Sequence, residues 1–473
     1  MAKQEVQQDG QAWPKDRRTP SKLTPASWIN TLFAAFFVAI PPILFYTVLF
    51  RKALNLPIGD DYHATLDFTN HLILLKGASA KCLYFLAAQH NEYKLFFLHA
   101  LAWLQLDLSG HVDFRVLSAI ANGFVILLAI LLWKMFLPNH KDLAARLAFF
   151  IPVSWLLFQL QHWENLNWAA DGLQHIPLLP FALGAIYLLV RGERWAFGSA
   201  LGCFILAVAA DGNGLLMIPI GLLILVRARR YARVLSWLAA SAVCVAAYAF
   251  RFDFMSSQID AHRSVLSTFH PLSPAYILAF IGSAGSIFRG SIVLGILLCC
   301  FFVFMAFRGY TRKNPAVSYC VLFLLLTAIG VAGLRSDLGV VQGLSSRYAI
   351  YSALLLIFAW FAIVEEFLQH RRLSPLHNNV LVGVTIAVIL FSLFMDWLGS
   401  AMLEDRSRGL VKAMAAYEHP ASPESTNGPT PWFQSLTLGT PSDAFNLSAR
   451  ATLDQSIKLG VYRPPDYPSA DVQ

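Results

Sequence analysis

The chain has 473 residues, of which 57% are hydrophobic, 13% aromatic and only 14% charged, and its formal net charge is +8. This composition excludes an ordinary soluble enzyme and predicts an all-α polytopic membrane protein. Because the positive charge follows the loops between apolar segments, we attribute it to membrane topology and expect no nucleic-acid partner.

The sequence begins with a polar, basic segment, residues 1–27, that we expect to be a cytoplasmic tail without a folded core. The apolar run at 28–50 that follows is long enough to span a bilayer, and no small-residue cleavage site comes after it. This run therefore predicts a first transmembrane helix and not a cleaved signal peptide.

Apolar segments recur up to residue 399, and together with the first run they predict about eleven spans. Lys and Arg concentrate in loops on the side of the N-terminus, including 134–146, 191–194, 227–233 and 308–313, which assigns that side to the cytoplasm. We therefore expect an outer loop at 51–112, a transmembrane bundle at 113–399 and a small extracytoplasmic C-terminal region at 400–473. The expected spans are 28–50, 113–136, 147–161, 172–190, 195–210, 214–226, 234–250, 289–307, 317–334, 347–365 and 378–397.

The outer loop opens with PIGDDYHATLDF at 57–68, in which Asp60 and Asp61 are adjacent. One interpretation is a helix cap, because carboxylates stabilise the first turn of a helix, here an expected helix that runs to Lys76 and stops at Gly77. Two neighbouring carboxylates also hold each other's pKa values apart, so that one can act as a general base. Asp60 and Asp61 are therefore candidate catalytic residues, and which of them is the base stays open.

His63, Asp67 and His71 recur every four residues along the same expected helix. Imidazole and carboxylate groups on one helix face can bind zinc or manganese. The same spacing is also typical of the wet side of an interfacial helix, so these three residues are weak metal candidates.

Next comes QHNEYK at 89–94, where Glu92 and Lys94 precede a short apolar stretch, 95–108, that is interrupted by polar residues. We expect this stretch to be an interfacial helix and not a span. Glu92 and Lys94 are either an ordinary surface pair or a site for a phosphate or metal beside the membrane, where Lys acts as a point charge.

Two motifs in later outer loops also carry polar groups: HWENLNW at 162–168 and DGNG at 211–214. In the first, Trp163 and Glu164 suit sugar binding, because aromatic rings stack on sugars, and they equally suit an interfacial aromatic belt. DGNG first of all predicts a tight turn between two spans.

A third motif, SSRY at 345–348, opens a span at the outer surface. Arg347, beside Tyr348, would clamp a lipid-linked phosphate, snorkel to the interface or pair with Asp337. Arg263, in the outer loop 251–274, could contact the same phosphate. Elsewhere we expect a surface or re-entrant helix at 275–288, and helices at 403–417 and 444–459 in the C-terminal region.

The segment NEYKLFFLHALAWLQLDLSGHVDFRVLSAIANGFVILLAILLW, with the acidic pair that precedes it, resembles the first outer loop and second span of the GT-C glycosyltransferases. It is most similar to the branch of the aminoarabinose transferases and protein O-mannosyltransferases, although it has Tyr-Lys-Leu-Phe at 93–96 in place of that branch's Lys-Pro-Pro-Leu. The three later motifs resemble those of poorly characterised bacterial relatives. The resemblance covers about 90 residues well and the rest in topology only.

The resemblance implies an inner-membrane enzyme that transfers a sugar, with inversion, from a polyprenyl-phosphate-linked donor to a glycan, lipid or protein acceptor of the cell envelope. An acidic residue of the first outer loop, Asp60 or Asp61, would be catalytic, and Arg347 and Lys94 would neutralise the departing phosphate. No cofactor is assigned, and a divalent metal stays open. The alternatives are a lipid or glycan transporter or flippase, a polysaccharide polymerase, and a noncatalytic scaffold.

Overall fold

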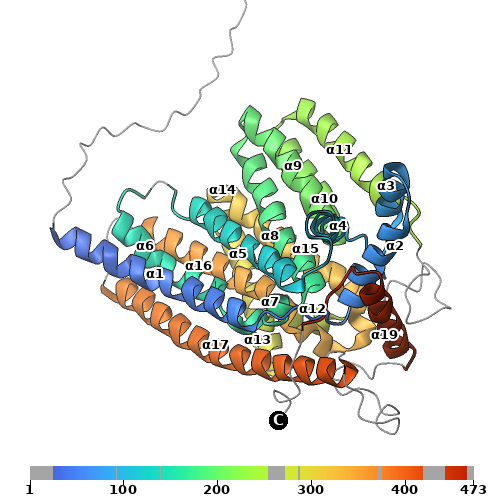
Figure 1. The fold of residues 1–473 in the computed structure, drawn as a ribbon. Coiled ribbons are helices and arrows are strands. Elements are labelled where there is room, and N and C mark those ends of the chain that lie inside the picture. The colour runs from blue at the N-terminus through green and yellow to red at the C-terminus, as the bar shows by residue number, and fades with distance from the viewer. Residues whose placement is uncertain are drawn as a thin grey trace, which may run out of the picture.

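The structure is a computed structural model, and it describes residues 25–91, 93–138, 140–253, 272–285, 288–369, 375–418 and 443–465 (Figure 1). In these residues the chain is almost entirely helical, and its only extended pairings are two isolated bridges, at His90–Tyr93 and Val112–Tyr462. The all-α prediction is confirmed.

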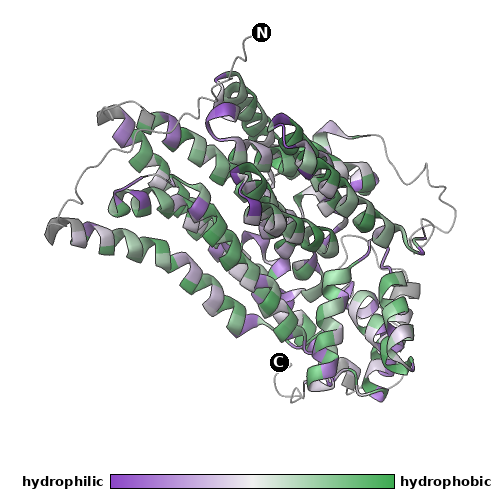
Figure 2. Ribbon diagram, turned by 90° about the horizontal axis from the view of Figure 1, so that it is seen from above, coloured by the Kyte–Doolittle hydropathy of each residue, from purple (hydrophilic) through white to green (hydrophobic). Residues whose placement is uncertain are grey.

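Nine helices in the described residues are long and apolar enough to cross a membrane, so the chain is a multi-pass membrane protein. Figure 2 shows that hydrophobic residues dominate these long helices and that hydrophilic residues gather mostly at their ends and in the connections. The nine are α1 (Pro25–Lys52), α5 (Phe114–Met135), α6 (Leu143–Leu157) together with the turn that extends it to His162, α8 (Ala169–Arg191), α11 (Tyr231–Ala249), α13 (Phe288–Phe307), α15 (Pro315–Arg335), α16 (Ala349–Gln369) and α17 (Pro375–Glu418).

The other two expected spans form shorter helices. These are α9 (Arg194–Ala210), of 17 residues, and α10 (Met217–Arg227), of 11 residues, which follows a 3₁₀ turn, η3 (Gly212–Leu216). At a rise of about 1.5 Å per residue both fall short of a hydrocarbon core of about 30 Å. Eleven crossings therefore stay a prediction.

Helix α17 is longer than expected, because the last span and the predicted helix at 403–417 form one continuous helix of 44 residues. There is thus no boundary at residue 400. Because Gly399 has no side chain, α17 packs closely against the backbone of Leu160, whose carbonyl oxygen would lie 2.2 Å from a Cβ at this position. Its extension carries polar residues of the C-terminal region to the end of the bundle where the first outer loop lies (Figure 1).

The loop 51–112 holds short helices, as predicted. The expected helix from Asp60 begins as a π-helix, η1 (Asp61–Asp67), continues as α2 (Phe68–Leu74) and ends before Gly77. π-helical turns are rare and are frequent at functional sites. After α3 (Ala78–Ala87), the apolar stretch at 95–108 forms a separate helix, α4 (Phe96–Ser109). The short helix expected at 275–288 is α12 (Pro274–Ile281), followed by η5 (Ser283–Gly285).

The C-terminal region ends in α19 (Asp443–Lys458), which confirms the helix expected at 444–459 and lies beside α2 (Figure 1). Asn70 of α2 donates to Ser456 Oγ at 2.9 Å, and Tyr462 donates to the carbonyl oxygen of Asn55 at 2.6 Å. Tyr462 also belongs to a buried apolar cluster with Tyr62 and Phe114, separate from the larger cluster of the bundle. The C-terminal segment therefore packs against the loop that carries the acidic pair.

Candidate functional site

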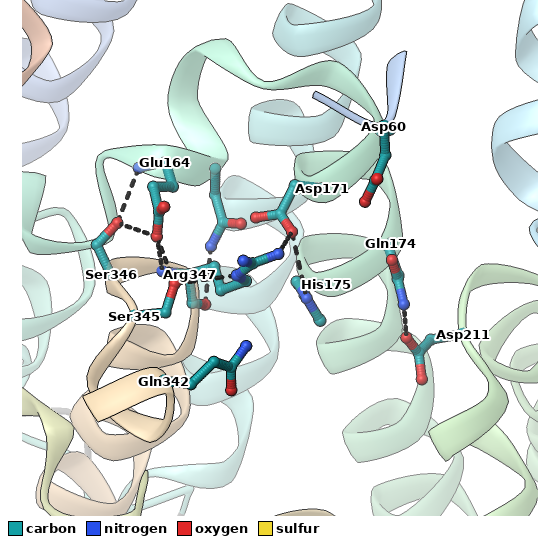
Figure 3. A network of polar contacts seen from close by, with 12 residues as sticks. Asp60, Glu164, Asp171, Gln174, His175, Asp211, Gln342, Ser345, Ser346 and Arg347 are labelled. Carbon is teal, nitrogen blue, oxygen red and sulfur yellow. Dashed lines mark hydrogen bonds and ion pairs between the residues drawn. The ribbon is translucent and has the colours of Figure 1, made fainter. Parts of the chain in front are cut away.

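The polar motifs of four separate loops meet at one end of the bundle (Figure 3). HWENLNW begins at the last residue of a 3₁₀ turn, η2 (Leu160–His162), and forms one short helix, α7 (Glu164–Asn167), between α6 and α8. SSRY follows two 3₁₀ turns, η6 (Ser336–Leu338) and η7 (Val340–Leu344), and forms a third, η8 (Ser346–Tyr348), which opens α16.

Glu164 joins the first of these motifs to the third. Its Oε2 accepts hydrogen bonds from the hydroxyls of Ser345 (2.7 Å) and Ser346 (2.8 Å) and from the backbone N–H of Arg347 (3.1 Å). Burial opposes ionisation, but the charges of Arg347 and Arg406 and the serine hydrogen bonds outweigh it, so the pKa of Glu164 lies well below its ordinary value. Glu164 is therefore an ionised, buried anchor.

Arg347 is bound on several sides. Its Nη1 donates to Asp171 Oδ1 of α8 at 2.9 Å, and its Nε donates to Ser345 Oγ at 3.0 Å. Its guanidinium also lies 5.1 Å from the ring centre of Trp168. Arg347 thus pairs with Asp171 and not with Asp337, the partner considered from the sequence.

Asp171 also approaches His175, one turn further along α8, whose Nε2 lies 3.6 Å from Asp171 Oδ1. The other ring nitrogen, Nδ1, lies 3.2 Å from the hydroxyl of Tyr351 on α16. Asp171 Oδ2 is buried and has no hydrogen-bond partner among the described residues. A buried acceptor left open in this way is suited to a donor from a bound molecule.

DGNG forms the predicted turn. Asp211 accepts the backbone N–H of Asn213 at 2.6 Å and the side-chain amide of Gln174, on α8, at 2.6 Å. The turn is thereby tied to the helix that carries Asp171. Figure 3 shows this hydrogen bond between Gln174 and Asp211 beside the contacts of Asp171.

Asp60 comes from the first outer loop and points toward Asp171 and Gln174 (Figure 3). Its side chain is 42% exposed, caps no helix, and places Oδ1 3.3 Å from His90 Nε2. Partial burial opposes ionisation, but His90 and the charges of Arg347 and Arg335 outweigh it and hold the pKa of Asp60 well below its ordinary value. Asp60 is thus an ionised carboxylate that a ligand can reach.

Asp61 is in a different environment, fully buried and bonded through both oxygens. Oδ1 accepts the N–H of Ala170 at the start of α8 (2.7 Å), and Oδ2 accepts the N–H of Ile58 (3.0 Å). Burial raises the pKa of Asp61 to about 8, against the opposing effect of these hydrogen bonds. Of the two adjacent acids, Asp61 fastens the loop to α8, and Asp60 is left to face the site.

Lys94 is fully buried, and its ammonium is already satisfied by protein groups. Nζ donates to the carbonyl oxygens of Leu86 (2.9 Å), Ala87 (2.8 Å) and Phe250 (2.8 Å). The bonds to Leu86 and Ala87 cap the end of α3, and the bond to Phe250 caps the end of α11, as a cation at a helix C-terminus does. The three N–H donors of the ammonium are used on three carbonyl oxygens, so Lys94 has no donor left for a phosphate.

The remaining sequence candidates lie in different places. Trp163 borders the network, and Tyr348 is buried in aromatic packing, with its ring 4.8 Å from that of Phe280. Glu92 and Arg263 lie outside the described residues.

The expected metal-binding face does not form one cluster in the described residues. His71 lies against Asp67, with Nδ1 and Oδ1 3.3 Å apart. No group of three or more His, Cys, Asp or Glu side chains in the described ranges is arranged to hold a metal ion. Because η1 is π-helical, the four-residue spacing no longer corresponds to one turn between His63 and Asp67. Metal dependence stays open.

Sequence reasoning missed four charged or titratable residues around the network. These are Asp171, His175, Arg335 and Arg406. Asp171 directly precedes the expected span 172–190 and His175 falls within it, and their i, i+4 spacing just after HWENLNW is a signal that could have identified them. Arg406 was read as part of a polar tail, and Arg335 only as a loop charge.

A pocket of about 170 Å³ lies beside this network. Gln161, Ser283 and Ser346 are its polar lining residues, and Trp163 and, from α17, Met395, Gly399 and Met402 are among the others. A pocket lined by both apolar and polar groups suits a ligand with a hydrocarbon part and a polar head. No family model, curated protein or solved structure matches this chain.

Proposed function

We propose that the protein is a GT-C-type membrane glycosyltransferase that moves a sugar from a polyprenyl-phosphate-linked donor to a hydroxyl of a cell-envelope glycan, lipid or protein. The reaction would take place at the outer face of a bacterial inner membrane, with the N-terminus in the cytoplasm and the C-terminus outside. The loop charges support this orientation.

The observation that carries the proposal is the position of Asp60. An accessible, ionised carboxylate from the first outer loop points toward the buried network of Glu164, Asp171 and Arg347, at the end of the bundle. A carboxylate in this setting can accept a proton from a bound hydroxyl. The pocket beside Trp163 and Ser346, which α17 lines with Met395 and Met402, supports a substrate that is part lipid.

In the proposed reaction, the acceptor hydroxyl gives its proton to Asp60 as its oxygen bonds to the anomeric carbon of the donor. The bond from that carbon to the phosphate oxygen breaks, the configuration inverts, and the lipid phosphate leaves with the electron pair. Asp171 Oδ2 would accept a hydrogen bond from a sugar hydroxyl, and the Gln174 amide would donate one to a sugar hydroxyl. Both residues lie on the same side as Asp60.

The location of the charges also distinguishes this proposal from a transporter. Asp171 and His175 lie within the first two turns of α8, and Arg347 lies two residues before the start of α16. At about 1.5 Å per residue these groups stay near one end of their helices, whereas transport sites are usually built near the bilayer midplane. Transport across the bundle remains the competing function in the test below.

The test uses cells that lack the native gene and express wild type, Asp60→Asn, Asp61→Asn or Asp67→Asn at matched membrane levels. Lipid-linked and surface glycans are compared by mass spectrometry. We expect Asp60→Asn to lose one defined sugar and to accumulate its lipid-linked donor on the outer face, while Asp67→Asn, an exposed neighbour on the same helix, resembles wild type. If the donor instead accumulates on the cytoplasmic face, the protein is a flippase. Unchanged glycans with Asp60→Asn at a complementing level would also contradict the proposal.

A further inference from the structure

Arg406, on the extension of α17, is a buried cation that forms no direct ion pair within the described part of the chain, although the charges of Glu164 and Asp171 act on it. The residue is 6% exposed, and its one direct polar contact there runs from Nη1 to Asn167 Oδ1 at 3.3 Å. The guanidinium lies between two indoles, 5.0 Å from the ring centre of Trp163 and 5.4 Å from that of Trp168. Burial of a charge that no counter-ion contacts directly costs free energy, and the nearby carboxylates offset that cost only without contact, so such a position suits a ligand that bonds to the guanidinium itself.

Several unused hydrogen-bond donors belong to the residues of this cluster. Arg406 Nε, Asn167 Nδ2 and Trp168 Nε1 are all buried and have no acceptor within the described residues. Arginine, amide and indole N–H groups cannot satisfy one another, because an acceptor must lie opposite each of them. A group with several acceptor oxygens and negative charge, such as a phosphate, would satisfy them together.

Two other cations proposed from the sequence for the phosphate, Lys94 and Arg347, are already engaged. Lys94 donates to three carbonyl oxygens, and Arg347 is held by Asp171 and Ser345. Arg406 therefore offers the free donors that Lys94 and Arg347 lack.

The same face of α17 also provides an apolar path to Arg406. Met395, Gly399 and Met402 line the pocket, and Arg406 follows at the next turn, with spacings of four, three and four residues. Trp163 both borders the pocket and covers the Arg406 guanidinium. Because Met402 is 43% exposed, a chain leaving the pocket would continue along the membrane-facing surface of α17.

We propose that Arg406, Asn167 and Trp168 bind the phosphate of a prenyl-phosphate lipid whose first isoprene units occupy the pocket along α17. The identity of the lipid rests on the proposed function, whereas the oxyanion chemistry rests on the unused donors. The two indoles would shield the phosphate from water and keep its interaction with Arg406 strong.

The test measures binding of farnesyl phosphate to the full-length protein in neutral maltoside-detergent micelles, with tryptophan fluorescence as the readout. Farnesol serves as the uncharged chain, and inorganic phosphate as the head group alone. We expect Arg406→Gln to weaken farnesyl phosphate binding about 10- to 100-fold, as the loss of a charge-assisted hydrogen bond does. The matched control, Arg408→Gln, changes an arginine two residues away that is 71% exposed and pairs with Glu404, and it should bind like wild type.

A second variant, Asn167→Asp, tests the site without removing the arginine. It keeps the acceptor for Arg406 and adds a fixed negative charge, so the protein should stay folded, with equal or higher thermal stability, and lose farnesyl phosphate binding. Equal binding by wild type and both variants would overturn the site. Farnesol that binds as tightly as farnesyl phosphate would overturn the phosphate contact, and inorganic phosphate that competes at equal concentration would overturn the lipid assignment.

The outcomes also separate this inference from the proposed function. Farnesyl phosphate binding that depends on Arg406, in a protein that transfers no sugar, would overturn the transferase and keep the site. Sugar transfer that depends on Asp60 while Arg406→Gln binds normally would keep the transferase and overturn the site.

Discussion

Arg347 and Asp171 form a buried ion pair between residues 176 positions apart in the sequence, with Nη1 and Oδ1 at 2.9 Å and side chains only 12% and 4% exposed. The pair joins the turn before α16 to the start of α8. Because Arg347 also contacts Glu164 through its backbone N–H, this link sets the relative position of α7, α8 and α16.

The first prediction concerns this pair. Asp171→Asn or Arg347→Gln leaves a buried charge unpaired and should cost about 3–5 kcal/mol of stability. The control is Arg191→Gln, which breaks the exposed Arg191–Glu193 pair and should cost less than about 1 kcal/mol. Thermal unfolding of the purified protein in detergent measures both. Equal effects at the two pairs would show that the buried pair does not hold the helices together.

The second prediction separates the two adjacent aspartates. Asp60→Asn removes an accessible carboxylate with no capping bond, so it should lower transfer about 10²- to 10⁴-fold at nearly unchanged stability. Asp61→Asn replaces one of two acceptor oxygens with a donor, so it should cost about 1–3 kcal/mol of stability. Initial rates and melting temperatures of the same preparations compare the two. The reverse pattern would assign the reaction to Asp61.

The third prediction is a pH dependence of stability. Burial raises the pKa of Asp61 to about 8, above the value of about 4 of an aspartate in an unfolded chain. Between these values the folded state keeps a proton that the unfolded state has released. The contribution of Asp61 to the free energy of unfolding is therefore fully present below a pH of about 4, declines as the pH rises and is lost above about 8.

The measurement is the melting temperature of wild type minus that of Asp61→Asn across this range. The difference should fall with rising pH, because only wild type carries the titrating group. Parallel profiles would show that the pKa of Asp61 is the same in the folded and unfolded states.

The fourth prediction concerns Lys94. Lys94→Met leaves three carbonyl oxygens without their donor and should cost at least about 1–3 kcal/mol, whereas Lys76→Met, at an exposed position of the same loop, should be neutral. Denaturation midpoints measure this difference. Should Lys94→Met be stable but raise the KM for the lipid donor, the phosphate role expected from the sequence would hold instead.

The fifth prediction concerns the C-terminal segment. Tyr462→Phe removes the hydrogen bond to the carbonyl of Asn55, and this should lower stability by about 1 kcal/mol and expose residues 51–112 to protease. Tyr417→Phe, which loses an exposed hydrogen bond to Asp454, is the matched control. Limited proteolysis with mass spectrometry locates the cuts. Identical cleavage of the two variants would mean that the segment does not secure the outer loop.

The sequence by itself determined the features that depend on local pattern. Apolar length predicted a multi-pass membrane protein, and the short interrupted run at 95–108 predicted a separate helix, found as α4. The helix at the C-terminus and the turn at DGNG followed from propensity and turn chemistry in the same way. These features are properties of neighbouring residues, so they can be read without knowing the fold.

Only the tertiary structure decided the role of each polar residue. Asp60 and Asp61 are identical in type and adjacent in sequence, yet the start of α8 buries one and leaves the other accessible. Lys94 was expected to meet a phosphate and instead meets three carbonyls, while Arg406, on the continuation of a span, faces inward between two tryptophans. Desolvation and hydrogen-bond partners set these outcomes, and both depend on residues brought together from distant parts of the chain.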